Sequence, residues 1–220
     1  MQPKTLDHVA FWVAGRDAIA GFLTAHLGVH VIDRQGNFTL LGADARRFKV
    51  TLFDAEGPRD AGAFGHIALR VNDLEAARAK LPAGAGEIFD AGEGFRLTLV
   101  QAGTDLDYDL DHVVLHSPTP TETAAEYERY GFRNVVPGRA QVGNAYVELR
   151  AGSAPRPDRP LLNHLAVLVD SANDHVADAE ELGIEVESVV DAANTYAAFL
   201  TGPEGVRIEY VEHKPTFSLT

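Results

Sequence analysis

The sequence predicts an α+β fold of four βαβββ modules in two halves, each half a curved mixed sheet that encloses a cavity and carries its helices outside. Three observations predict it. A pattern of an apolar residue, then Asp, Gly or Asn, then His, then a branched apolar residue occurs four times. A helical segment follows each copy, and a strand rich in β-forming residues closes each unit. The spacing of the copies is close to a quarter of the 220-residue chain.

Each copy of the pattern predicts the first strand of a module. The copies read "LDHVAFWV", "FGHIALRV", "LDHVVLHS" and "LNHLAVLV", and their histidines are His8, His66, His112 and His164. Successive histidines are 58, 46 and 52 residues apart. Each interval therefore has room for one helix and about three further strands.

The remaining elements of each module follow in the same order. The predicted helices are "GRDAIAGFLTAHLG", "NDLEAARAKLPAG", "TPTETAAEYERYG" and "DSANDHVADAEELG", with apolar residues at helical spacing. Gly28, Gly131 and Gly183 end three of them, because glycine readily adopts the left-handed conformation that terminates a helix. The closing strands are "RFKVTLF", "GFRLTLV", "NAYVELR" and "VRIEYVE".

Two polar stretches predict the boundaries between modules in the second part of the chain. "GTDLDYDL" separates the second module from the third, and "AGSAPRPDRP" separates the third from the fourth. We therefore expect two halves, residues 1–105 and 106–220, each built from two consecutive modules.

Composition limits the function. A formal net charge of −13 argues against nucleic acid or an anionic membrane surface as a partner. The chain has no cysteine, so any metal must be held by His, Asp, Glu or water. The sequence shows neither a secretory signal nor a run of about 18 to 20 apolar residues, so we expect a cytoplasmic protein.

Alternation of side chains along a strand predicts which way the histidines face. Leu165, Val167 and Val169 share the bulky face of the fourth copy, so His164 lies on the opposite face, which would line a cavity in a curved sheet. Carboxylates occur in the closing strands of the last two modules. The corresponding residues, in module order, are Thr51, Thr98, Glu148 and Glu209.

The carboxylates distinguish the second half from the first. A buried carboxylate in mid-strand is unfavourable unless it is paired or binds a cation. Two imidazoles and one carboxylate form the facial triad of non-haem Fe(II) oxygenases, which the second half can build and the first cannot. We therefore expect His112 and His164 to bind a metal and His8 and His66 to be structural.

These features, with the late segment "GPEGVRIEY", resemble the vicinal oxygen chelate superfamily, which includes glyoxalase I, bleomycin-resistance proteins and type I extradiol dioxygenases. The layout is most similar to the four-module extradiol enzymes. That resemblance implies a metal-free first half and a second half with the ligands His112, His164 and Glu209. It implies Fe(II), with Mn, Ni and Zn as alternatives, and an extradiol-type ring cleavage of a catecholic aromatic with O₂. We also expect a homo-oligomer.

Two departures from the extradiol pattern leave alternatives open. Phe199 stands where those enzymes carry an acid–base tyrosine, so His116 and Tyr196 are the remaining catalytic candidates. Glu148 is either a further ligand, as in a glyoxalase-like isomerase or lyase using Ni or Zn, or a salt-bridged residue held by Arg150 or Arg207. A metal-free small-molecule-binding protein of the bleomycin-resistance kind is the third alternative.

Overall fold

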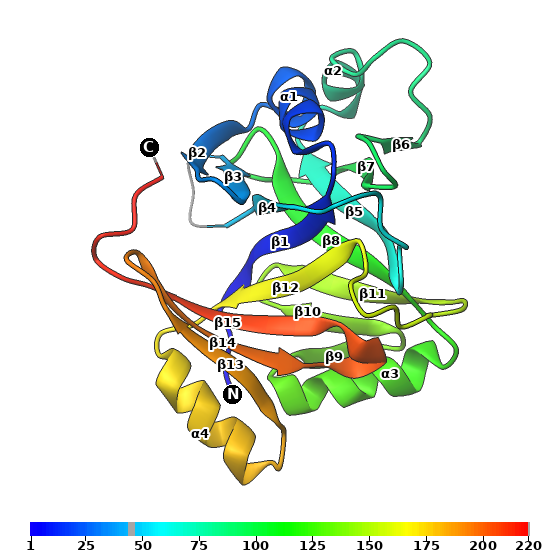
Figure 1. Cartoon of the computed structure of the whole chain (residues 1–220). Helices are drawn as coiled ribbons and strands as arrows, with labels where there is room; N and C mark the ends of the chain where they lie inside the picture. The colour runs from blue at the N-terminus through cyan, green and yellow to red at the C-terminus, as the bar shows by residue number, and fades with distance from the viewer. Residues whose placement is uncertain (44–46, 220) are drawn as a thin grey trace.

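The computed structural model describes residues 1–43 and 47–219, which form two mixed sheets with helices outside them (Figure 1). The predicted α+β class and the repeated module are confirmed. The second module is shorter than expected, because two strands rather than three follow its helix among the described residues.

The eight-stranded sheet combines the first module with the fourth. Its strands, in spatial order, are β13 (Val186–Asp191), β14 (Thr195–Thr201), β15 (Arg207–His213), β12 (Leu162–Leu168), β1 (Thr5–Val13), β4 (Lys49–Asp54), β3 (Phe38–Gly42) and β2 (His30–Arg34). β1 and β12 pair antiparallel at its centre, and each has the closing strand of its own module parallel on its other side.

The seven-stranded sheet combines the second module with the third. Its strands, in spatial order, are β6 (Ile88–Asp90), β7 (Arg96–Gln101), β5 (Phe64–Val71), β8 (Asp109–Ser117), β11 (Ala145–Ala151), β10 (Arg139–Val142) and β9 (Arg133–Val136). β5 and β8 take the central antiparallel places that β1 and β12 take in the first sheet.

The modules therefore group differently from the expected halves, residues 1–105 and 106–220. The chain crosses from one sheet to the other after β4 and returns before β12. The repeated pattern predicts the strands within each module. It does not predict which module's first strand pairs with the first strand of another module. Here the edges of β1 and β12, 156 residues apart at His8 and His164, form the hydrogen-bonded pair.

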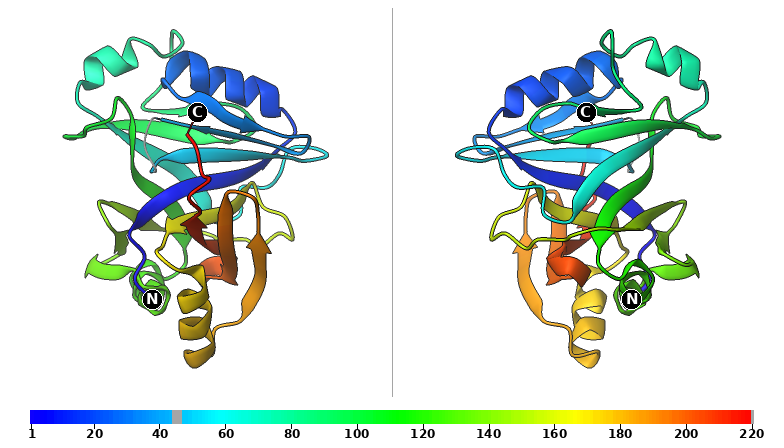
Figure 2. Two further views of the ribbon diagram at one scale, coloured as in Figure 1. Left: turned by 90° about the vertical axis from the view of Figure 1, so that its left-hand side faces the viewer. Right: turned by 90° about the vertical axis from the view of Figure 1, so that its right-hand side faces the viewer.

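The helices cover the sheets at two opposite ends of the molecule. They are α1 (Arg16–His26), α2 (Leu74–Arg78), α3 (Pro120–Glu126) and α4 (Ala172–Glu181), with the 3₁₀ turns η1 (Tyr127–Tyr130) and η2 (Pro203–Gly205). Figure 2 shows α1 and α2 at one end and α3 and α4 at the other. The Ser171 hydroxyl accepts a hydrogen bond from the backbone N–H of Asp174 and so caps α4.

One continuous hydrophobic core joins both sheets and all four helices. In β1 the bulky face is fully buried, and Phe11 packs on Phe64 and Phe95 with ring centroids 5.1 and 4.3 Å apart. The opposite face of β1 carries His8 and the partly exposed Trp12. The predicted division of faces is thus present, and it leaves the histidine side of the sheet open to a cavity.

Candidate metal centre

His8, His164 and Glu209 converge on one point of the eight-stranded sheet. Nε2 of His8 lies 3.0 Å from Nε2 of His164, and Oε2 of Glu209 lies 3.0 Å from the first and 2.9 Å from the second. The two imidazoles belong to the adjacent central strands β1 and β12, and the carboxylate belongs to β15. Figure 1 shows these three strands side by side. Among residues 1–43 and 47–219 this is the one cluster of three such side chains within metal-binding distance.

Burial makes this cluster a strong candidate for a cation. The three side chains are between 4% and 11% exposed, and Oε2 of Glu209 is satisfied by no hydrogen bond among the described residues. Its near neighbours are the two imidazole nitrogens, which lie within 3.0 Å but without hydrogen-bond geometry, and such poorly satisfied buried polar groups are destabilising. A bound divalent cation would remove that cost, so this donor set fits a metal.

Hydrogen bonds on the outer side of each imidazole fix its orientation. Nδ1 of His8 lies 2.8 Å from Oδ2 of Asp7, and Nδ1 of His164 lies 2.9 Å from Oδ1 of Asn163. Each oxygen accepts a hydrogen bond from the Nδ1–H of its histidine, which leaves each Nε2 directed at the cluster. Such partners orient histidine ligands and raise their basicity in known metal sites.

Asp7 is itself held by a buried cation. Nζ of Lys49 donates to Oδ1 of Asp7 over 2.7 Å, and both side chains are 1% exposed. Nε2 of His213 lies 3.1 Å from the same oxygen. Burial opposes ionisation of Asp7, but Lys49 and the two histidines outweigh it and hold the pKa of Asp7 well below its ordinary value.

Without a metal, the Glu209 carboxylate is ionised and the His8 imidazole holds a proton. Burial acts to raise the pKa of Glu209, but His164 and His8 lower it. Burial acts to lower the pKa of His8, yet Glu209 and Asp7 raise it to about 9. Burial lowers the pKa of His164, so this imidazole stays neutral. A divalent metal would displace the proton of His8, and its binding would release that proton.

A cavity of about 650 Å³ opens in front of the cluster. Its apolar wall includes Phe38, Phe53 and Phe199, and the ring of Phe199 meets that of His164 edge-on with centroids 5.3 Å apart. The segment after β15 contributes Phe217, which stacks on His213 at 3.9 Å. A volume of this size and an aromatic lining suit a small organic ligand.

Thr51 occupies the position in the first module that Glu209 occupies in the fourth. Thr51 pairs with Ala10, two residues after His8, and Glu209 pairs with Ala166, two residues after His164. The four equivalent positions of the two modules therefore supply three ionisable donors and one hydroxyl. Three protein donors of this kind would leave a bound metal with positions for other ligands.

A family model described as the Glyoxalase/Bleomycin resistance protein/Dioxygenase superfamily matches residues 5–91, which include β1 with His8 and the whole first module. The match covers the first module and most of the second. The same βαβββ pattern continues through the third and fourth modules, and each sheet is assembled from two modules.

Solved structures of the same fold cover nearly the whole chain. A candidate dioxygenase from Bacillus subtilis gives a TM-score of 0.78 at 16% identity and covers 97% of this chain and 86% of its own. Glyoxalase I from Zea mays gives 0.72 at 18% identity, with 94% and 92% covered. The cppA protein from Streptococcus pneumoniae gives 0.68 at 13% identity, with 96% and 100% covered. At these identities the likeness establishes the fold. No curated protein sequence matches the chain.

The fold places His112 away from the other two expected ligands, His164 and Glu209. His112 lies on β8 of the seven-stranded sheet, where Nδ1 contacts Asp111 at 2.7 Å, Nε2 lies 3.3 Å from Glu148, and the ring stacks on Tyr146 at 4.6 Å. His8, expected to be structural, takes its place beside His164 and Glu209. The reason is the pairing of β1 with β12, which the identical strand patterns could not reveal.

Glu148 and the catalytic candidates also lie outside the cluster. Arg150 binds Glu148 through two contacts of 3.3 Å, one of the partners expected for a salt-bridged carboxylate. His116 lies at the end of β8 in the other sheet, and the hydroxyl of Tyr196 donates to Asn173 over 2.9 Å, on the side of α4. Neither lines the cavity, whereas Phe199 does.

Sequence reasoning missed two groups at the site, Asp7 and Lys49. Asp7 directly precedes a histidine of the repeated pattern, as Asp111 and Asn163 do, and all three contact Nδ1 of that histidine. The Asp or Asn of the pattern could therefore have been interpreted as the partner that orients each imidazole. No helix among the described residues is long and apolar enough to cross a membrane.

Proposed function

We propose that this chain is a metal-dependent dioxygenase of the extradiol type, with Fe(II) held by His8, His164 and Glu209 and a catecholic aromatic and O₂ as substrates. One observation carries the proposal. Two imidazoles and one carboxylate converge on one side of a cavity, and the fourth equivalent position is the hydroxyl of Thr51. Three protein ligands of this kind leave room for a chelating substrate and oxygen.

The cavity wall supports an aromatic substrate. Phe53 and Phe199 lie on two sides of His164, with ring centroids 6.3 and 5.3 Å from the imidazole. Aromatic rings pack favourably at such separations in tilted or edge-on arrangements. A flat ring that reaches the cluster would therefore contact both phenylalanines while its polar edge faces the histidines.

The protein's own groups would orient the substrate and exclude water. Bound Fe(II) would supply the Lewis acidity that favours an ionised catechol and the electrons that O₂ requires. Asp7 and Asn163 hold the imidazoles in place, and the Thr51 hydroxyl faces the cavity as a hydrogen-bonding group. Phe199 cannot donate or accept a proton, so its apolar ring would exclude water from this side of the site.

A glyoxalase-like isomerase or lyase using Ni or Zn is the second candidate. Phe199 favours it, because the cavity lacks a tyrosine at the place where an extradiol enzyme carries an acid–base group. In that reaction the Glu209 carboxylate, kept ionised by His164 and His8, would itself move the substrate proton.

Metal analysis and oxygen consumption separate the candidates. The chain is purified without oxygen, its metal content is determined, and O₂ uptake is followed with a panel of catechols. The proposal expects one iron per chain and uptake with yellow ring-cleavage product. Bound Ni or Zn without O₂ uptake would favour the isomerase, and absence of any stoichiometric metal would refute both enzymes. A cytoplasmic location and a homo-oligomer remain part of the proposal.

A further inference from the structure

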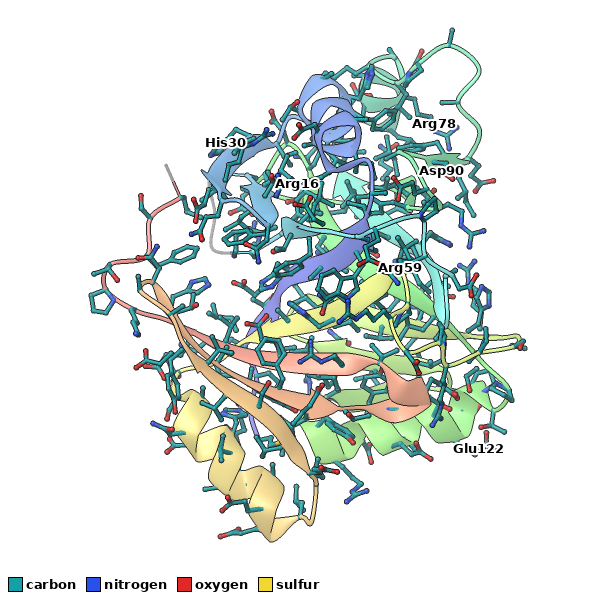
Figure 3. All side chains as sticks on the ribbon, viewed as in Figure 1. Arg16, His30, Arg59, Arg78, Asp90 and Glu122 are labelled. Carbon is teal, nitrogen blue, oxygen red and sulfur yellow. The ribbon has the colours of Figure 1, made fainter. Side chains whose placement is uncertain are left out.

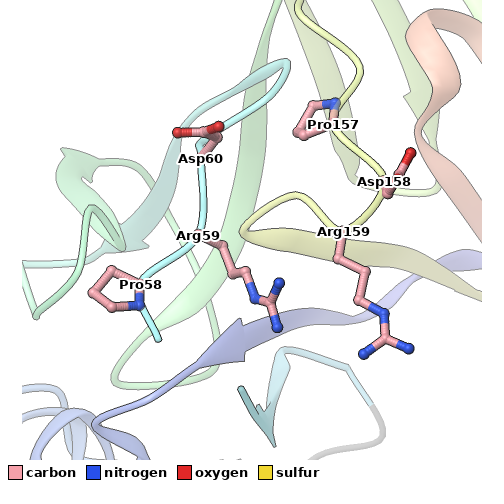
Figure 4. A pocket seen from close by; sticks show the side chains of 6 residues that line it. All are labelled: Pro58, Arg59, Asp60, Pro157, Asp158 and Arg159. Atoms are coloured by element: carbon pink, nitrogen blue, oxygen red, sulfur yellow. The ribbon is translucent and has the colours of Figure 1, made fainter. Parts of the chain in front are cut away.

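The two connections between the sheets lie side by side and place two arginines in one hollow. The first connection follows β4 and the second precedes β12. Together they line a hollow of about 440 Å³. Its lining residues, shown in Figure 4, are Pro58, Arg59, Asp60, Pro157, Asp158 and Arg159. Figure 3 shows Arg59 near the middle of the molecule, whereas Arg78 and Glu122 stand at its periphery.

Backbone hydrogen bonds hold this hollow in shape. The N–H of Leu161 donates to the carbonyl of Asp60 over 2.7 Å, which joins one connection to the other. The carbonyl of Leu161 accepts from the N–H of Trp12 over 2.9 Å, which fixes both connections to the end of β1. Arg59, Arg159 and Trp12 are therefore arranged before any ligand arrives.

Neither guanidinium has a carboxylate partner among residues 1–43 and 47–219. Nε of Arg59 is buried and forms no hydrogen bond with a described residue. Figure 4 shows the guanidinium groups of Arg59 and Arg159 directed to the same side, with the carboxylates of Asp60 and Asp158 turned away from them. Two unpaired cations facing one hollow attract an anion, and guanidinium binds carboxylate and phosphate oxygens in pairs.

A row of aromatic rings leads from the hollow toward the candidate metal centre. The guanidinium carbon of Arg159 lies 5.7 Å from the ring centre of Trp12, which lies 5.3 Å from Phe53, which lies 6.3 Å from His164. Arg159 and His164 are five positions apart in the sequence, so their Cα atoms are at most about 18 Å apart. A ligand whose ring packs on Trp12 would therefore extend from the hollow toward the candidate metal centre.

We infer that Arg59 and Arg159 bind the anionic group, a carboxylate or a phosphate, of an aromatic ligand that packs on Trp12. Where this ligand is the substrate, the inference rests on the proposed function and makes the substrate an aromatic acid. Anion binding in the hollow does not itself require a metal, so the two ideas are tested separately.

Trp12 provides the test, because it is the single tryptophan of the chain. Metal-free protein is titrated with 3-phenylpropionate, with phenyl phosphate and with neutral 3-phenylpropanamide while Trp12 fluorescence is followed. The expected result is saturable binding of at least one anion and no binding of the amide. A preference between the two anions identifies which group the hollow accepts.

Variants assign the binding to the two arginines. Arg59→Gln and Arg159→Gln should each weaken anion binding about 10- to 100-fold, as expected for the loss of a charge-assisted hydrogen bond. Arg156→Gln is the matched control, because Arg156 lies in the same connection but pairs with Glu204 at 3.5 Å outside the hollow. Its affinity should equal that of the wild type.

Equal binding of acid and amide, or unchanged affinity in both glutamine variants, would overturn the inference. The proposed function fails independently if anions bind to the hollow while no catechol consumes O₂. If catechols are consumed but Arg159→Gln leaves the KM for carboxylated and neutral catechols unchanged, the substrate part of the inference is refuted and the dioxygenase stands.

Discussion

The two sheets carry the same four side-chain types in the same register, yet among the described residues these groups come within metal-binding distance in the eight-stranded sheet and not in the other. Each central strand supplies a histidine, and the closing strands supply a threonine and a glutamate. In the order histidine, threonine, histidine, glutamate, the eight-stranded sheet has His8, Thr51, His164 and Glu209, and the seven-stranded sheet has His66, Thr98, His112 and Glu148.

The residue two places after the glutamate explains much of the difference. In β11 this is Arg150, which binds both carboxylate oxygens of Glu148. In β15 it is Val211, a buried apolar residue that cannot compete for Glu209. A carboxylate that is already paired has little to gain from a metal, whereas Glu209 has only imidazoles beside it. We therefore expect a metal at Glu209 rather than at Glu148.

Loss of a ligand should have the largest effect. His8→Ala and His164→Ala each remove one of three donors, so metal affinity should fall by more than about 100-fold, beyond the range typical of residues that merely orient a ligand. Isothermal titration with Co(II) measures it. His112→Ala is the control and should bind as the wild type does. If His112→Ala lost metal binding and His8→Ala kept it, the ligand set expected from the sequence would be supported instead.

Weakening the support of His8 should have a smaller effect. Asp7→Asn preserves shape but removes the charge that orients and polarises the imidazole, so metal affinity should fall about 10- to 100-fold. Asp111→Asn makes the same change beside His112 in the other sheet. Equal affinities for the two variants would show that Asp7 has no part in the site.

Acid should destabilise the seven-stranded sheet through His66. Burial, with Arg150 and His112 nearby, lowers the pKa of His66 to about 4 against an opposing effect of Glu148. The unfolded chain binds this proton near pH 6.5, so the stabilisation is complete above that pH and is lost as the pH falls to 4.

Urea unfolding at pH 7.5 and pH 4.5 measures this contribution. His66→Gln cannot be protonated and should lose less stability between the two pH values than the wild type does. Identical losses in both proteins would show that His66 is not responsible for the acid sensitivity.

Removal of the competing cation should have the smallest effect. Arg150→Val gives Glu148 the neighbour that Glu209 has, so a second, weaker metal equivalent should appear in a Co(II) titration. The double variant Arg150→Val, His66→Ala should lose that second equivalent and keep the first. A titration of Arg150→Val that shows one equivalent only would mean that more than the arginine separates the two sheets.

Sequence patterns predicted the modules, the strand faces and the association of His164 with Glu209, because each depends on spacing within one module. The choice between His8 and His112 depends on which module lies beside the fourth, and that is decided by packing between strands far apart in the chain. Tyr196 lies on the α4 side of β14, where its hydroxyl donates to Asn173. Phe199, three residues later and on the opposite face of the strand, lines the cavity.

The pairing of β1 with β12 also sets the order of events during synthesis. His8 is synthesised about two hundred residues before Glu209, so the three donors can come together only after the last module has been synthesised. A chain released before the fourth module has been made contains none of the assembled cluster, whatever the state of its first three modules. Metal uptake at this site would therefore report that the last module is complete and docked.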